Sequence, residues 1–182
     1  MIKMTLPKDV LTKNPTIDAS AFIARGAQVM GDVRVAAHVS IWYNCVCRGD
    51  INYISIGENT NVQDGSILHL ENDFPCIIEN DVTIGHHANI HGCHIEEGCL
   101  IGIGAIILSG AHIKRGSIIG AGAVVKENAV IEPFSLVVGI PGKVIRKTPE
   151  DTVETQIKWA QKYVQLAQIH KEKGLGISPL TV

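Results

Sequence analysis

The chain has 182 residues, of which 46% are hydrophobic and only 4% aromatic, and its formal net charge is −2. The lack of a basic stripe argues against a nucleic-acid partner. No apolar run is long enough for a membrane span, and the first fifteen residues lack a secretory signal, so we expect a cytoplasmic protein. Five cysteines, an odd number, fit reduced thiols. An aliphatic composition with 18 glycines and few aromatic rings indicates narrow, repeated layers.

From Ile17 to Val137 an aliphatic residue recurs at intervals of six, and the period resumes after each interruption. An α-helix would need an apolar spacing of about 3.6 and a simple amphipathic strand would need strict alternation, so neither explains this period. We term these positions the lead residues. They are Ile17, Ile23, Val29, Val35, Ile41, Cys47, Ile56, Val62, Leu68, Ile78, Ile84, Ile90, Ile95, Ile101, Ile107, Ile113, Ile119, Val125, Ile131 and Val137.

Most lead residues are followed three places later by Gly, Asn or Asp, which tolerate positive φ, as at Gly26, Asp32, Asn44 and Asp50. A small or apolar residue stands one place further and would point inward with the lead residue. Each hexapeptide therefore predicts a short strand and a corner, and three hexapeptides close a triangular coil. We expect residues 1–147 to form an all-β solenoid of parallel strands, with residues 70–77 looping out as an insertion that leaves the phase unchanged.

A single α-helix is predicted over residues 148–173. Thr148 offers an N-cap hydroxyl, Pro149 suits the first helical position, and acidic residues follow in the first turn. Apolar residues then recur on one helical face, which would pack along a flank of the solenoid and cover it. They are Val153, Ile157, Ala160, Val164 and Ala167. Residues 174–182 are expected to form a frayed tail.

Three of the eight histidines are placed by the repeat in a pattern that suggests a metal site. His69 and His91 each follow a lead residue by one place, and their leads, Leu68 and Ile90, are three hexapeptides apart. The two side chains should therefore stack about 4.8 Å apart, a suitable span for two ligands of one metal. His86 follows its lead by two places, near a corner of the neighbouring face. A site that uses all three must be completed across a subunit boundary.

Two further residues share these columns. Arg48 falls one coil before His69 in the same column, and Asp64 lies one coil beneath His86. Around them, Arg48-Gly-Asp50, Asn61-Val-Gln63-Asp64, His69 and Gly85-His86-His87-Ala-Asn-Ile-His91-Gly92 resemble the motifs of the gamma-class carbonic anhydrases. The resemblance extends over roughly the whole chain, including the C-terminal helix.

The resemblance implies a left-handed parallel β-helix, a homotrimer and a Zn²⁺ site, with Fe²⁺ or Co²⁺ as other metals found in the family. His69 and His91 would come from one subunit and His86 from its neighbour. Gln63 would orient the metal-bound water or bicarbonate with support from Asn61, and Tyr163 would lie over the metal. Arg48 and Asp50 would form an interfacial ion pair. Asp64 would contact the metal-binding residues without binding the metal itself. Metal-bound hydroxide would then attack CO₂ to give bicarbonate.

The sequence departs from the family pattern at the residues that would carry the proton released in CO₂ hydration away from the metal site. Ile51 stands where the founding member carries a glutamate after the Arg-Gly-Asp motif, and the loop that carries a second acidic shuttle is short here. Glu71 or Asp73 could replace it, or the loop could be a plain solvated turn. Three alternatives stay open at this point: an acyltransferase with one histidine as general base, a thioesterase acting on coenzyme A thioesters, and a non-catalytic trimeric scaffold that retains the metal site.

Overall fold

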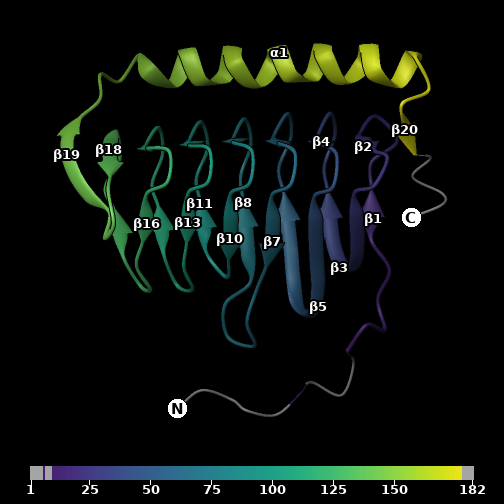
Figure 1. Ribbon diagram of the computed structural model, residues 1–182, viewed down its shortest axis with the longest axis horizontal. Coiled ribbons are helices and arrows are strands. Elements are labelled where there is room, and N and C mark those ends of the chain that lie inside the picture. The colour runs from purple at the N-terminus through teal and green to yellow at the C-terminus, as the bar shows by residue number, and fades with distance from the viewer. Residues whose placement is uncertain (1–5, 7–9, 178–182) are drawn as a thin grey trace.

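The computed structural model describes residue 6 and residues 10–177, which form a left-handed parallel β-helix with one long C-terminal helix along its side (Figure 1). The expected all-β solenoid is therefore confirmed. The strands are β1 (Thr16–Ile17), β2 (Phe22–Ala24), β3 (Gln28–Val35), β4 (Ser40–Ile41), β5 (Val46–Ile56), β6 (Asn61–Val62), β7 (Ile67–His69), β8 (Cys76–Ile78), β9 (Thr83–Ile84), β10 (Asn89–His91), β11 (His94–Ile95), β12 (Leu100–Ile101), β13 (Ile106–Ile107), β14 (His112–Ile113), β15 (Ile118–Ile119), β16 (Val124–Val125), β17 (Val130–Ile131), β18 (Ser135–Val138), β19 (Lys143–Lys147) and β20 (Gly176–Ile177).

The strands make three faces. The first carries β7, β10, β13 and β16, and the second carries β8, β11, β14 and β17. The long strands β3 and β5 run through the corner between these faces and pair on both. The third face is a separate sheet with the order β19-β18-β15-β12-β9-β6-β4-β2-β20. Along each face the pairing is parallel, except that β19 and β20 pair antiparallel at the two ends of the third sheet.

The core is a column of lead residues and their small partners. Ile41, Val62, Ile84 and Ile101 are each fully buried and lie on successive coils of the third sheet. Asn44, Asn59, Asp81 and Asn128 adopt positive φ at corners, as their residue types predict. The interior is filled mainly by aliphatic side chains and cysteines, and its cross-section leaves little room for aromatic rings, which accounts for the low aromatic content.

Two predicted corners are absent. Asp32 lies within β3 and Asp50 within β5, and neither has positive φ; Gly31 takes the left-handed conformation instead, at φ +78°. There β3 and β5 approach so closely that a Cβ atom on Gly31 would lie 2.1 Å from the carbonyl oxygen of Gly49. The glycine pair lets both strands continue past the corner, which carries the Asp50 carboxylate to the edge of the first face.

The helix α1 (Thr152–Glu172) contacts β2, β4, β6 and β9, so it covers the third sheet. It begins four residues later than Thr148. Asp151 is the N-cap residue and makes no side-chain cap bond, while the Thr148 hydroxyl is buried without a hydrogen-bond partner. The buried residues of α1 are Val153, Gln156, Ala160 and Ala167.

The end of the chain also differs from expectation. Within the predicted tail, Gly176 and Ile177 form β20 and pair with Ala24 and Ile23, and Arg25 donates a hydrogen bond to the carbonyl of Gly174. The rest of the predicted tail, residues 178–182, lies outside the described part of the chain. In the part that is described, no helix is long and apolar enough to cross a membrane, and all five cysteines are free and buried.

Candidate functional site

His69 and His91 occupy the same column on adjacent coils. Leu68 pairs with Ile90 and His69 with His91 in the parallel register of β7 and β10, which confirms the spacing predicted from the repeat. The ring centroids are 5.2 Å apart, and Nδ1 of His69 lies 3.2 Å from Nε2 of His91. Arg48 follows Cys47, which pairs with Leu68, so it falls one coil earlier in this column as expected.

The outer side of His69 is fixed by Asp50. Oδ1 of Asp50 lies 3.0 Å from Nε2 of His69, and its other oxygen accepts a hydrogen bond from Arg48 of the same chain. Burial alone would raise the pKa of the Asp50 carboxyl, but the bonds from Arg48 and His69 outweigh it and hold this pKa below its ordinary value. An ionised carboxylate can only accept, so Nε2 of His69 carries a hydrogen, and in the neutral imidazole Nδ1 is then left bare.

His91 is held from its outer side by Ser109, which the sequence analysis did not predict, and by Glu71, which it considered only as a proton shuttle. Nδ1 of His91 lies 2.9 Å from Oγ of Ser109, and that hydroxyl donates to Oε1 of Glu71 at 2.8 Å. The Ser109 hydroxyl has one hydrogen and donates it to Glu71, so its oxygen must accept a hydrogen bond from Nδ1 of His91. Nε2 of His91 is then bare, like the nitrogen that faces it.

The facing nitrogens of the two histidines thus both present lone pairs at 3.2 Å. With both rings neutral, these lone pairs would repel each other unless a cation, either a shared proton or a metal ion, lay between them. Two nitrogens bound to one tetrahedral zinc at 2.0–2.1 Å are about 3.3 Å apart, which matches this separation. Burial lowers the pKa of His91, and the neighbouring His69 and Arg48 lower it further against the opposing effect of Glu71. The neutral imidazole that a metal requires is therefore favoured.

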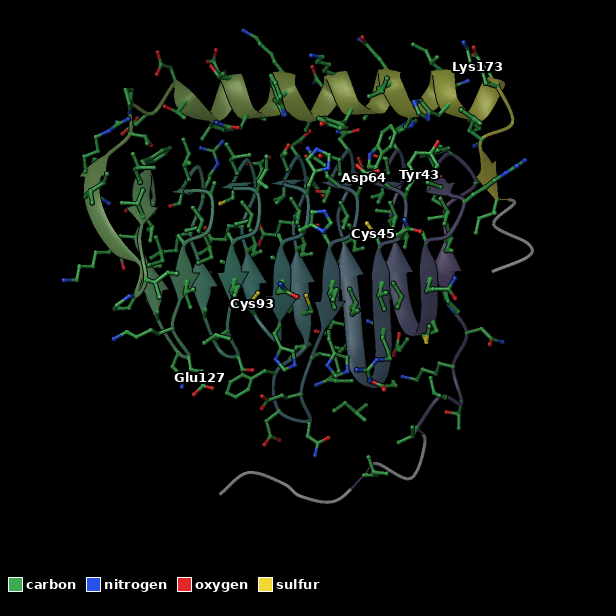
Figure 2. The ribbon with its side chains drawn as sticks, in the orientation of Figure 1. Tyr43, Cys45, Asp64, Cys93, Glu127 and Lys173 are labelled. Carbon is green, nitrogen blue, oxygen red and sulfur yellow. The ribbon has the colours of Figure 1, made fainter. Side chains whose placement is uncertain are left out.

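His86 lies on a different side of the solenoid. Its Nδ1 atom is 2.9 Å from Oδ2 of Asp64, and Val62 pairs with Ile84, so Asp64 is one coil beneath it as the phase predicted. Asp64 is on the side that faces α1 (Figure 2). Among residues 10–177, no three His, Cys, Asp or Glu side chains are gathered closely enough within this chain to hold a metal ion. A single chain brings together two of the three predicted ligands.

The side chains predicted to bind water or bicarbonate lie near His86. Nε2 of Gln63 donates to Oδ1 of Asn61 at 3.1 Å, and Nδ2 of Asn61 donates to the hydroxyl of Thr83 at 2.9 Å. All three are buried. This row of hydrogen bonds fixes the amide orientation of Gln63. The side-chain nitrogen of Asn61 is used on Thr83, so Asn61 can present only its oxygen to Gln63, and Gln63 must donate.

Tyr163, on α1, faces the same region. Burial raises the pKa of its hydroxyl and the nearby Asp64 carboxylate acts in the same direction, while a hydrogen bond with Gln63 opposes them. Together with His86, Gln63 and Trp159 it lines a largely apolar groove of about 500 Å³ between α1 and the third sheet. The predicted residues therefore form two clusters, one around His69 and His91 and one around His86.

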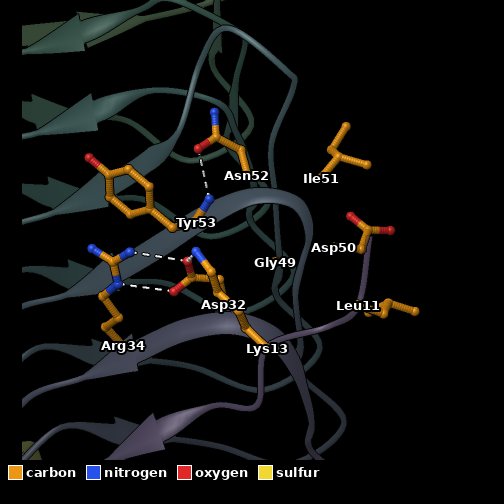
Figure 3. A pocket seen from close by; sticks show the side chains of 9 residues that line it. All are labelled: Leu11, Lys13, Asp32, Arg34, Gly49, Asp50, Ile51, Asn52 and Tyr53. Atoms are coloured by element: carbon orange, nitrogen blue, oxygen red, sulfur yellow. Dashed lines mark hydrogen bonds and ion pairs between the residues drawn. The ribbon is translucent and has the colours of Figure 1, made fainter. Parts of the chain in front are cut away.

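A smaller pocket of about 190 Å³ adjoins Asp50 (Figure 3). Asp32 lies there between Lys13 and Arg34, at 2.6 Å and 3.0 Å, and the Arg34 guanidinium stacks 4.3 Å from the centre of the Tyr53 ring. Ile51, at the position of the missing glutamate, lines this pocket and packs against the core. The pocket holds as many acidic as basic side chains, so it has no strong charge preference.

Comparison with known proteins identifies the family to which the chain belongs. Residues 92–127 match the family model described as bacterial transferase hexapeptide (six repeats). A Methanocaldococcus jannaschii protein named "Probable carbonic anhydrase" is 50% identical over 152 residues, which cover 84% of this chain and 96% of that one. Gamma carbonic anhydrase 2, a mitochondrial protein of Arabidopsis thaliana, is 38% identical over 168 residues, or 89% of this chain. The chain belongs to the gamma carbonic anhydrase family.

Relatives in the gamma carbonic anhydrase family differ in how much of their length this chain covers. The chain spans 60% of the length of the Arabidopsis protein. Among solved structures, a Bacillus cereus protein provisionally described as an acetyltransferase is 43% identical, with a TM-score of 0.85 over 88% of this chain and 93% of that one. Gamma carbonic anhydrases and hexapeptide transferases thus share this fold, and the site residues must distinguish the two activities.

Proposed function

We propose that this protein is a carbonic anhydrase that interconverts CO₂ and bicarbonate at a metal site shared between subunits of a homotrimer. His69 and His91 of one subunit and His86 of its neighbour would hold Zn²⁺, with Fe²⁺ or Co²⁺ as alternatives. The observation that carries this proposal is the pair of bare nitrogens on His69 and His91, 3.2 Å apart. Membership of the gamma carbonic anhydrase family and free cysteines that suit a reducing compartment such as the cytoplasm are consistent with it.

When bound, a divalent cation held by three neutral imidazoles activates water for attack on CO₂ at neutral pH. The chain's own residues prepare the site. Asp50 fixes the tautomer and orientation of His69, and the Arg48 guanidinium keeps Asp50 ionised. Asp64 accepts from Nδ1 of His86 and so leaves Nε2 of that ring free to bind.

The groove beneath α1 would receive the substrate. Gln63 would orient bicarbonate or water, since its amide is fixed by Asn61 and Thr83, and Tyr163 would close this side of the site. The apolar lining from Leu100, Ile101 and Ile103 suits CO₂, a neutral molecule with weak hydration.

Three measurements on the purified protein test the proposal. Elemental analysis should find about one metal ion per chain, light scattering should give a trimer, and stopped-flow assays should show CO₂ hydration that a chelator abolishes and added zinc restores. A His69→Ala variant should lose metal and hydration together. A trimeric protein that binds zinc but does not hydrate CO₂ would disprove the carbonic anhydrase activity and favour thioester hydrolysis or a scaffold role.

An acyltransferase is the second candidate, because the Bacillus cereus structure described as an acetyltransferase has the same fold at 43% identity. The distribution of histidines argues against it. A general-base mechanism needs one imidazole with an accessible nitrogen, and it does not explain why His69 and His91 direct two bare nitrogens at each other. Acetyl transfer from acetyl coenzyme A by a protein stripped of metal would establish this second function.

A further inference from the structure

Glu71 is not part of a plain solvated turn. Residues 70–75 connect β7 to β8, and the side-chain amide of Asn52 donates to the carbonyl oxygens of Glu71 and Asn72 at 3.1 Å and 3.0 Å. The backbone amide of Glu71 also donates to the carbonyl of Phe74 at 3.1 Å. The loop backbone is therefore anchored to β5, and the Glu71 side chain projects from a fixed position.

Ser109 occupies the next coil beyond His91. It follows β13, whose Ile107 pairs with Ile90, and it is 6% exposed. Gly92 lies beside it: a Cβ atom on Gly92 would stand 3.5 Å from Oγ of Ser109 and 3.0 Å from the carbonyl of Phe74. The missing side chain at Gly92 lets the loop backbone at Phe74 approach closely.

We infer that Glu71 and Ser109 act as a positioning relay that selects the Nδ1–H tautomer of His91 and so presents its Nε2 lone pair to the shared metal position. This inference rests on the proposed function for its purpose, though not for its geometry. The carboxylate takes the only hydroxyl hydrogen at 2.8 Å, which obliges Ser109 to accept from Nδ1 at 2.9 Å. Without Glu71, the hydroxyl would be free to donate to Nδ1, and the hydrogen would move to Nε2 and block the ligand position.

The relay matches Asp50 on the other histidine. Asp50 acts directly on Nε2 of His69, whereas Glu71 acts on His91 through one intervening hydroxyl. The two carboxylates lie on opposite outer sides of the pair and direct its two bare nitrogens inward. Each histidine thus has its own orienting group, and neither group is a metal ligand.

Ser109→Ala and Glu71→Ala test the relay, with Ser109→Thr as the variant that keeps the hydroxyl. Zinc affinity, measured by competition with a chelator, should fall about tenfold in each alanine variant and stay near wild type in Ser109→Thr. Because the two residues act in series, the double variant should lose little more than either single one. In the metal-free wild-type protein, imidazole 15N shifts should report a protonated Nδ1 and a bare Nε2 on His91, and Glu71→Ala should populate the other tautomer.

Glu79→Ala is the matched control. Glu79 lies 2.7 Å from Nε2 of His94, and their side chains are 42% and 35% exposed, against 40% and 36% for Glu71 and His91. It should leave zinc affinity unchanged. An unaltered tautomer and affinity in both Ser109→Ala and Glu71→Ala would overturn the relay while leaving carbonic anhydrase activity intact. A wild-type protein that binds none of Zn²⁺, Fe²⁺ and Co²⁺ would instead refute the proposed function, and the tautomer measurement would still decide the relay.

Discussion

Nδ1 of His86 lies 2.9 Å from Oδ2 of Asp64 on the side of the solenoid that carries α1, away from the pair formed by His69 and His91. If the site is shared, a His86→Ala subunit and a His91→Ala subunit should complement each other. Each pure variant should lack metal and activity. Random mixed trimers contain one intact site each, so an equal mixture should recover about one quarter of the wild-type metal content and activity.

The mixture is prepared by unfolding and refolding the two variants together, and it is compared with the variants refolded separately and then combined. The latter should stay inactive as long as subunits do not exchange. Failure of the co-refolded mixture to bind metal, in the presence of mixed trimers identified by mass, would rule out a site shared between subunits.

The hydrogen-bond chain from Thr83 to Gln63 should matter for catalysis and not for metal binding. Thr83→Val keeps the side-chain shape but removes the acceptor for Nδ2 of Asn61, leaving a buried amide unsatisfied at a cost of about 1–3 kcal/mol. Asn61 would turn, and Gln63 would lose its fixed orientation. We expect kcat/KM for CO₂ hydration to fall about tenfold with full metal content, a loss of about 1.4 kcal/mol of transition-state stabilisation.

Thr60→Val provides the comparison, because Thr60 is equally buried but its hydroxyl bonds the backbone, at Glu79 and Val82, and does not line the groove. It should lower the melting temperature and leave kcat/KM unchanged. Equal kinetic losses in both variants would show that the effect of Thr83→Val is one of stability alone.

Asp32 should contribute to stability in a pH-dependent way. Its hydrogen bond with Arg34 lowers the pKa of the carboxyl, burial opposes this, and Lys13 adds to the lowering. A carboxyl whose pKa is lower in the folded state stabilises the fold fully above its unfolded-state pKa, about 3.9, and the contribution is lost as the pH falls through the lower folded value. The partners are about half exposed, so Asp32→Asn should cost about 1 kcal/mol or less at pH 7.

Urea unfolding of the wild type, Asp32→Asn and the exposed-site variant Glu127→Gln, at equal protein concentration, measures this effect. The difference between Asp32→Asn and the wild type should be constant from pH 5 to pH 7 and should shrink in strong acid. A difference that persisted at pH 2 would mean that Asp32 acts through packing.

Substitutions at Ile101 test how closely the core is packed. Ile101 is fully buried at the centre of the third sheet, between Ile84 and Ile119 on the adjacent coils. Ile101→Val should lower the free energy of unfolding by about 1 kcal/mol and Ile101→Ala by about 2–5 kcal/mol, because the stacked coils restrict collapse around the cavity. Urea denaturation of the series checks this, and equal values for the two variants would indicate that the interior relaxes freely.

The sequence predicted the fold and part of the site for a physical reason. One buried aliphatic residue per hexapeptide determines the phase of every strand, so counting from Leu68 to Ile90 was enough to align His69 with His91. The same counting placed Asp64 beneath His86. Periodic positions are predictable because the core imposes them.

Contacts made by the loop and by the close approach of strands were not predictable in this way. The contact between Ser109 and His91 joins two adjacent coils, and Glu71 reaches Ser109 only because the 70–75 loop folds back over Gly92, an effect with no sequence signature. Asp32 and Asp50 were expected at corners, but the close contact between Gly31 and Gly49 lets the strands continue. The N-cap of α1 was predicted at Thr148, three residues before the observed Asp151, because Thr148 has the residue type of a cap but not its position.

The two antiparallel strands at the ends of the third sheet limit how copies of this rod can associate. β19 lies on β18 with the opposite direction at one end, and β20 does the same on β2 at the other. A further coil of another molecule could not extend the parallel ladder of this sheet, because it would meet a strand of the wrong polarity at either end. The third sheet therefore disfavours end-to-end stacking of coils, which would lead to fibres, and leaves the lateral faces for association into a closed ring.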